Sequence, residues 1–134
     1  ILGNDNALKY QPENTKKLFC PDKKLYANLL RRIPSGMKLW EGNTVTCEVI
    51  LAETEEDVSN WSNCGYLGVE MEGAMIFALS KYFNIPSAAI FSVSDNLIES
   101  ETLLHESHEL SKTLREMARS TQYDVAIQEL LSGQ

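Results

Sequence analysis

The apolar and polar residues of this chain fall into blocks that predict alternating helices and strands. Residues 3–21 are rich in Asn, Gly and Pro, which is typical of a loop. Residues 22–33 place their leucines on one side of a helix, and Asp22 is a candidate N-cap. Residues 43–51 are rich in β-branched side chains, which favours a strand.

The second part of the chain continues the same alternation. Residues 54–65 predict a short helix that carries acids at its start. Residues 70–83 predict a helix that is apolar on most sides, and therefore one that is buried on most sides. Residues 87–93 form a short apolar run of the kind found in a central strand. Residues 101–119 and 123–132 predict two closing helices.

The order helix, strand, helix, helix, strand, helix is that of an α/β protein with parallel strands joined by crossovers. A length of 134 residues is enough for one domain with a core of its own. Hydrophobic residues make up 43% and charged residues 23% of the chain, as in soluble globular proteins. No apolar run approaches the length of a membrane span, so we expect no membrane partner.

Charge and cysteine content narrow the possible partners. The net charge of -7 disfavours nucleic acid, and the few basic pairs are interpreted as solvated helix faces. Cys20, Cys47 and Cys64 are few and widely spaced, which predicts buried thiols in a reducing, cytoplasmic compartment and no zinc site. The chain begins at Ile1 without an initiator Met, which suggests a piece of something longer.

Three acids stand beside apolar segments and are the candidate chemistry. Glu70 and Glu72 open the predicted helix 70–83, and Asp95 follows the predicted strand 87–93. Ligands of α/β sheets bind beyond the carboxyl ends of the strands, where these acids are expected. An ionised Glu72 could accept two hydrogen bonds from a vicinal diol such as a ribose. Asp95 could hold or deliver a proton to a leaving group.

Structural interpretations stay open beside the functional ones. Glutamates in a first helical turn are favoured by the helix dipole alone, and an Asp after a strand often caps the next turn. His105 and His108 are three residues apart, a spacing that a metal site could use. No third ligand accompanies them, so a solvated helix face is the preferred interpretation, and no metal is expected.

Two segments carry a resemblance to a known family. The run Gly-Tyr-Leu-Gly-Val-Glu-Met-Glu-Gly-Ala at 65–74, an apolar helix, and then Phe-Ser-Val-Ser-Asp-Asn at 91–96 resembles the nucleoside phosphorylase and nucleosidase superfamily. The likeness is to its hexameric purine nucleoside phosphorylase branch. It implies a three-layer αβα fold with a central mixed sheet, of which residues 1–134 are the C-terminal half of a single domain. It also implies a homo-oligomer, either a dimer or a hexamer.

The resemblance assigns a role to each matching position. Met71 and Glu72 would contact the ribose, Val69 would lie near the base, and Asp95 would protonate purine N7. His108 stands near the position of an arginine that assists this Asp, and Ile50 stands where the family has an aromatic residue against the nucleoside. The remaining predicted substrate-binding residues are Glu70, Ser94 and Asn96. The substrates would be a purine nucleoside and phosphate, with no cofactor.

The resemblance leaves the reaction open. The first hypothesis is phosphorolysis of a purine or methylthio-purine nucleoside by a protein of which this chain is incomplete for catalysis. The alternatives are a methylthioadenosine or S-adenosylhomocysteine nucleosidase that uses water, and a non-catalytic nucleoside-binding or assembly module. The family holds phosphate with a glycine-rich loop and arginines that this chain lacks. That difference, with Ile50 and His108, favours the non-catalytic alternative.

Overall fold

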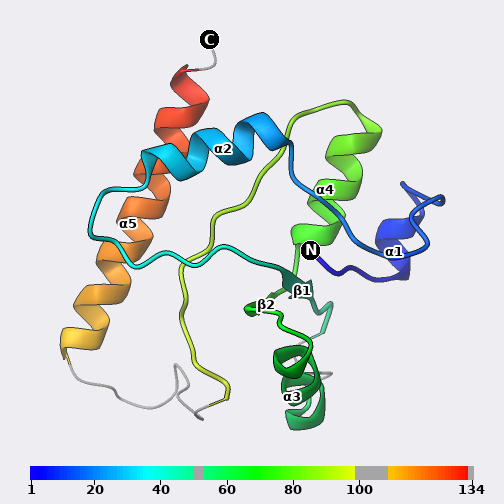
Figure 1. The fold of residues 1–134 in the computed structure, drawn as a ribbon, viewed down its shortest axis with the longest axis horizontal. Helices are drawn as coiled ribbons and strands as arrows, with labels where there is room; N and C mark the ends of the chain where they lie inside the picture. The colour runs from blue at the N-terminus through cyan, green and yellow to red at the C-terminus, as the bar shows by residue number, and fades with distance from the viewer. Residues whose placement is uncertain (50–52, 99–108, 133–134) are drawn as a thin grey trace. The chain divides into compact units, whose positions relative to one another are not determined.

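The computed structural model describes residues 1–49, 53–98 and 109–132, and for 109–111 the backbone alone. The chain divides into two compact units, and each is described by itself. The first unit contains residues 1–26 and 38–89, and the second contains residues 27–37 and 90–134. Figure 1 shows the ribbon with the helices and strands labelled.

Side chains fix the starts of two helices in the first unit. The helix α1 (Asp5–Leu8) is capped by Asn4, whose Oδ1 atom accepts hydrogen bonds from Asn6 N at 3.1 Å and Ala7 N at 3.2 Å. The sequence predicted only loop here. The helix α3 (Glu55–Asn63) begins with a capping box between Thr54 and Asp57, and Gly65 follows it at φ +82°. This helix and its end are as predicted.

A parallel pair of short strands forms the sheet of the first unit. The strand β1 (Thr44–Thr46) pairs with β2 (Gly68–Glu70), and α3 is the crossover between them. Leu2 lies on the other side of β1 and exchanges hydrogen bonds with the backbone of Thr44 and Thr46, each at 2.9 Å. Parallel strands joined by a crossover helix are confirmed, but the second strand is 68–70, which was not predicted as a strand. The strand predicted at 43–51 is regular over only three of the described residues.

The helix predicted at 70–83 begins later than expected. Residues 68–70 belong to β2, and α4 runs from Gly73 to Tyr82. The carbonyl of Glu70 accepts a hydrogen bond from Cys47 N at 2.8 Å, so this backbone is part of the sheet and cannot open the helix. The predicted start was therefore wrong by three residues.

The core of the first unit lies where α1, α4 and the N-terminal segment meet. The buried apolar cluster contains Ala7, Phe19, Ala74, Phe77 and Ala78. Ala74, Phe77 and Ala78 lie on one face of α4. The apolar side chains of Ile76, Tyr82 and Phe83 at the same helix are each more than half exposed. The prediction that this apolar helix is buried on most sides is therefore wrong for the described structure.

The second unit is built on α5 and the second half of α2. The helix α2 (Lys23–Arg32) begins after Asp22, whose side chain accepts a hydrogen bond from Leu25 N at 2.8 Å, as predicted. The helix α5 (Glu109–Ser132) is continuous, although two helices were predicted here. The residues between the predicted helices, Ser120, Thr121 and Gln122, include no Gly or Pro that would end a helix. Residues 101–108 lie outside the described part.

The strand predicted at 87–93 is not regular in the structure. Its backbone is bonded elsewhere. Asp22 N donates to the carbonyl of Ser87 at 2.7 Å, and the side chain of Gln122 donates to the carbonyl of Ile90 at 2.7 Å. A strand needs a neighbouring ladder, and the sheet of the described residues contains only β1 and β2. The central mixed sheet of the resemblance stays a prediction.

The cysteines differ from expectation. Cys20 and Cys64 are exposed and Cys47 is half-buried, so the prediction of three buried thiols is wrong. Cys64 is the C-cap residue of α3, and Cys20 precedes Pro21 between two elements. Neither position faces the core. None of the helices in the described residues is long and apolar enough to cross a membrane.

Candidate functional site

The start of α4 is held by two side chains that come from the two strands. Glu70 Oε2 accepts hydrogen bonds from Glu72 N at 2.9 Å and Gly73 N at 2.5 Å. Thr46 Oγ1 accepts from Ala74 N at 2.9 Å and donates to Glu70 Oε1. The first N–H groups of a helix lack backbone acceptors, and here the side-chain oxygens of Glu70 and Thr46 accept their hydrogen bonds.

Gly73 makes room for this arrangement. A Cβ atom at position 73 would lie 2.9 Å from both carboxylate oxygens of Glu70. The carboxylate could not then approach the helix backbone as closely. The glycine that follows Glu-Met-Glu therefore has a physical reason in the structure, which is the close approach of a carboxylate to a helix N-terminus.

The other residues predicted at this junction face outward. Glu72 is the N-cap residue of α4 but makes no capping bond with its own side chain. Its carboxylate is exposed and makes no polar contact within the described part of the chain. Met71 is 42% exposed, and Val69 is half-buried on β2. Glu70 is used by the fold, whereas Glu72 and Met71 are presented to solvent.

The segment around Asp95 belongs to the second unit. Ser94 Oγ donates to Asp95 Oδ2 at 2.8 Å, and the side chain of Asp95 is half-buried. From α5, Arg115 Nη1 donates to the carbonyl of Ser94 at 3.3 Å. Asn96 is exposed. The pair Ser94–Asp95 is thus fixed locally by one hydroxyl and from α5 by one guanidinium.

The structure brings the predicted residues together in two groups. Val69, Glu70, Met71 and Glu72 form one group in the first unit, and Ser94, Asp95 and Asn96 form the other in the second unit. Ile50 and His108 lie outside the described residues. Sequence reasoning missed Thr46 and Arg115. The β-branched strand around Thr46 gave no sign of a cap, and Arg115 lies twenty positions after Asp95 in the sequence.

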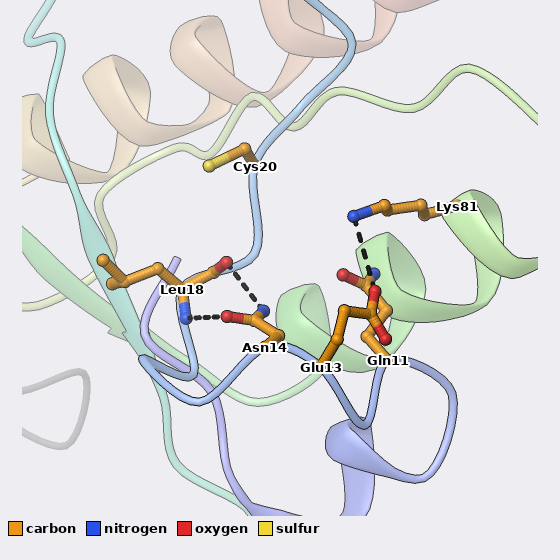
Figure 2. Close-up of a pocket in the computed structure, with 6 residues that line it drawn as sticks. All are labelled: Gln11, Glu13, Asn14, Leu18, Cys20 and Lys81. Atoms are coloured by element: carbon orange, nitrogen blue, oxygen red, sulfur yellow. Dashed lines mark hydrogen bonds and ion pairs between the residues drawn. The ribbon is translucent and has the colours of Figure 1, made fainter.

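Two pockets in the described part of the chain are lined by other residues. One of about 300 Å³ lies in the first unit (Figure 2) and is lined by Gln11, Glu13, Asn14, Leu18, Cys20 and Lys81. Lys81 Nζ and Glu13 Oε1 are 3.8 Å apart on its wall. None of the predicted site residues contributes to it. No cluster of three or more potential metal ligands occurs among the described residues.

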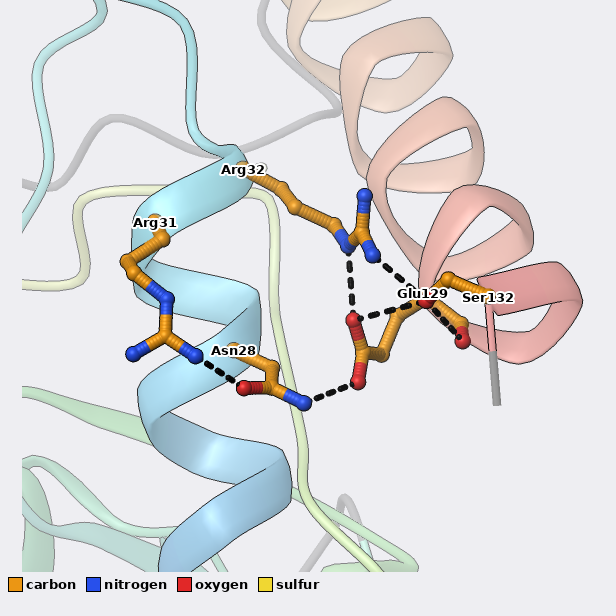
Figure 3. Close-up of polar contacts among 5 residues, drawn as sticks. All are labelled: Asn28, Arg31, Arg32, Glu129 and Ser132. Atoms are coloured by element: carbon orange, nitrogen blue, oxygen red, sulfur yellow. Dashed lines mark hydrogen bonds and ion pairs between the residues drawn. The ribbon is translucent and has the colours of Figure 1, made fainter.

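The second pocket, of about 270 Å³, lies between α2 and α5 and is lined by Asn28, Arg31, Arg32 and Glu129. Figure 3 shows the polar contacts that join Glu129 to Asn28, Arg32 and Ser132. The Glu129 carboxylate, 7% exposed, accepts from Arg32 Nε at 2.6 Å and from Asn28 Nδ2 at 2.5 Å. These hydrogen bonds, Arg32 first, hold the pKa of Glu129 below its ordinary value. The cluster joins two helices and is occupied by its own partners.

Comparison with known proteins identifies the family. A sequence model of the phosphorylase superfamily matches residues 3–126. A DeoD-type purine nucleoside phosphorylase of Clostridium beijerinckii is 31% identical over 81 residues, which are 60% of this chain and 34% of that protein. A second one, from Caldanaerobacter subterraneus subsp. tengcongensis, is 29% identical over 114 residues, which are 85% of this chain and 46% of that protein.

The match to a third DeoD-type purine nucleoside phosphorylase, from Bacillus cereus, is 29% identical over 94 residues and covers 70% of this chain and 39% of that protein. The chain therefore spans less than half the length of the curated relatives it matches. The family model, by contrast, covers nearly the whole of this chain, including the junction at Glu70–Gly73 and the segment at Ser94–Asn96. The chain, with its helices and small parallel sheet, belongs to the phosphorylase superfamily.

Proposed function

We propose that this chain carries the nucleoside-recognising part of a purine nucleoside phosphorylase-like site. The reaction is cleavage of the N-glycosidic bond of a purine or methylthio-purine nucleoside, with phosphate as the co-substrate and no cofactor. Glu72 and Met71 bind the ribose, Val69 lies near the base, and Asp95 protonates the leaving purine. Ser94 and Asn96 flank that acid, and Ile50 and His108 are assigned to the site by the sequence resemblance alone.

The observation that carries the proposal is the unused carboxylate of Glu72. A residue at a helix N-cap ordinarily satisfies the free N–H groups with its own side chain. Here Glu70 and Thr46 satisfy them, so the Glu72 carboxylate remains exposed at the positive end of α4. An ionised carboxylate in that position can accept both hydroxyls of a ribose without loss of any bond that the fold requires.

Asp95 supports the second half of the proposal. Its Oδ2 atom is bonded to Ser94 Oγ, which fixes the orientation of the carboxyl group, and the side chain is half-buried. A positioned acid that protonates a departing group contributes about 10²–10⁴-fold to a rate. Protonation of the purine as the bond to the sugar breaks is a role for which such an acid is suited.

The arginines favour a second candidate function. Three of the four arginines are engaged within the chain: Arg32 is paired with Glu129, Arg31 donates to Asn28, and Arg115 donates to the carbonyl of Ser94. The fourth, Arg119, is exposed on α5. Phosphate binding usually needs arginines or a glycine-rich loop that are free to meet the anion. Because most of its arginines are engaged in this way, the second candidate function of the chain alone is that of a nucleoside-binding module. The phosphate or water that attacks the sugar would then be held by residues outside this chain. The proposal also includes a cytoplasmic location, a homo-oligomeric state and a three-layer αβα fold for the whole protein.

Binding of inosine or adenosine to the chain, measured by calorimetry or NMR, tests the assignment of Glu72. Loss of a hydrogen-bonded charge weakens binding by about 1.5–3 kcal/mol, which is roughly 10–100-fold in Kd. We expect this loss for Glu72→Gln. Glu56→Gln, at an exposed acid of α3, removes the same charge and should leave the Kd unchanged. Equal affinities of Glu72→Gln and the wild type would contradict the proposal.

Release of free base, followed by chromatography in the presence of phosphate, tests the reaction. We expect none from the 134-residue chain, because three of its four arginines are engaged in contacts among the described residues and are not available to hold phosphate. In any longer form of the protein that releases base, Asp95→Asn should lower turnover by about 10²–10⁴-fold. Asp124→Asn, at an exposed residue of α5, is the matched control. Base release by the short chain, or unchanged turnover of Asp95→Asn, would overturn the corresponding assignment.

A further inference from the structure

The segment that leads to Asp95 has no strand beside it among the described residues, yet its backbone is held from α5 at two points. Gln122 Nε2 donates to the carbonyl of Ile90 at 2.7 Å, and Arg115 Nη1 donates to the carbonyl of Ser94 at 3.3 Å. Figure 1 shows the segment running beside α5 in the opposite direction to the helix. All four residues belong to the second unit.

The spacing of the two contacts matches the two kinds of backbone. Arg115 and Gln122 are seven residues apart, so they lie two turns apart on one face of α5, at a separation of about 10 Å. Ile90 and Ser94 are four residues apart, which in an extended chain is about 13 Å and places both carbonyls on the same side. Side chains as long as Arg and Gln accommodate the difference. The spacing of the two donors on α5 is therefore compatible with an extended backbone between Ile90 and Ser94.

We infer that Arg115 and Gln122 are positioning residues that hold segment 90–94 extended against α5 and thereby set the place of Asp95. The inference rests on the proposed function only for what Asp95 does. The order of contacts is short: Arg115 fixes the Ser94 carbonyl, the Ser94 hydroxyl fixes the Asp95 carboxylate, and the carboxyl group meets the leaving purine. Arg115 acts through the backbone of its neighbour and is not assigned a contact with substrate.

Amide hydrogen–deuterium exchange in the 134-residue chain tests the positioning without any nucleoside. A hydrogen bond of ordinary net strength changes local opening by about 3–10-fold. We expect Arg115→Met and Gln122→Met each to accelerate exchange of the amides at 91–96 by that factor. The controls are Arg119→Met and Gln128→Met, which remove the same groups at exposed positions of α5 and should leave these amides unchanged. Equal exchange in Arg115→Met and Arg119→Met would overturn the inference.

A kinetic readout separates positioning of Asp95 from general support of the fold. In a form of the protein that releases base, Arg115→Met should lower kcat by about 10-fold with KM within about two-fold, because Asp95 acts on the leaving group in the transition state. Arg115→Lys keeps a charged donor and should recover most of kcat. Arg115→Lys no better than Arg115→Met, or a loss that falls on KM alone, would refute the role.

The two proposals can fail separately. If Asp95→Asn leaves base release unchanged, the proposed function is wrong, while faster exchange at 91–96 in Arg115→Met still shows that α5 holds the segment. If exchange is unchanged but Asp95→Asn is inactive, the function stands and the positioning by Arg115 and Gln122 is refuted.

Discussion

Thr46 makes the start of α4 testable by a change of one atom. Replacing Thr46 by Val exchanges its hydroxyl for a methyl group of similar size and keeps the β-branched shape that suits a strand. The hydroxyl accepts from Ala74 N at 2.9 Å and donates to Glu70, so the change removes both bonds at once. The pairing of β1 with β2 uses backbone groups and is not affected directly.

The expected loss follows from burial. Ala74 is fully buried and Thr46 is 7% exposed, so water cannot replace the hydroxyl at the Ala74 N–H group. A buried donor left without a partner destabilises by about 1–3 kcal/mol, and loss of an N-cap by about 0.5–2 kcal/mol. These two figures describe the same lost bond and are not added. We expect Thr46→Val to lower the free energy of unfolding by about 2 kcal/mol.

Urea denaturation followed by circular dichroism measures this change. With a slope of about 2 kcal/mol per molar urea, the midpoint should fall by about 1 M at constant slope. The control is Thr44→Val, two residues earlier on β1. The buried hydroxyl of Thr44 has no hydrogen-bond partner among the described residues, so its removal should leave stability unchanged or raise it by up to about 1 kcal/mol. Equal losses in the two variants would refute the capping role of Thr46.

Two further predictions concern other parts of the structure. Because hydrogen bonds from Arg32 and then Asn28 lower the pKa of Glu129, its stabilising contribution is complete above the ordinary value of 4.5 and is lost as the pH falls below it. The difference in unfolding free energy between wild type and Glu129→Gln should therefore shrink from pH 7 to pH 3, whereas exposed Glu116→Gln should show no such trend. Gly3→Ala should lower the unfolding free energy by about 1–3 kcal/mol in the same urea assay, because its Cβ would lie 2.4 Å from the Phe19 ring. At Gly68 the nearest atom is 3.8 Å away, so Gly68→Ala should be tolerated, and similar losses at both glycines would contradict this reasoning.

The helices with local start and stop signals could be predicted from the sequence. Asp22 opens α2, Thr54 and Asp57 open α3, and Gly65 ends it, because capping depends on residues that are neighbours along the chain. The elements that depend on distant partners could not be placed in this way. Segment 87–93 has the composition of a strand, but its carbonyl groups accept hydrogen bonds from Asp22 and Gln122. Partners so distant in the sequence cannot be predicted from a local pattern.

The same distinction explains the two glutamates of the Glu-Met-Glu signature. As residues of one predicted helix start, Glu70 and Glu72 are both favoured by the helix dipole, and the resemblance to the family assigns the ribose contact to Glu72 without a physical reason for the choice. The strand β2 separates them, because it extends through Glu70 and delays α4 until Gly73. Glu70 then lies below the first turn and turns its carboxylate onto two N–H groups, with Thr46 from β1 serving the third. Glu72, two residues later, makes no capping bond, and its carboxylate is exposed at the start of the helix. The Glu72 carboxylate is thus left without a capping role because β2 pairs with β1, and this tertiary contact cannot be seen in the signature alone.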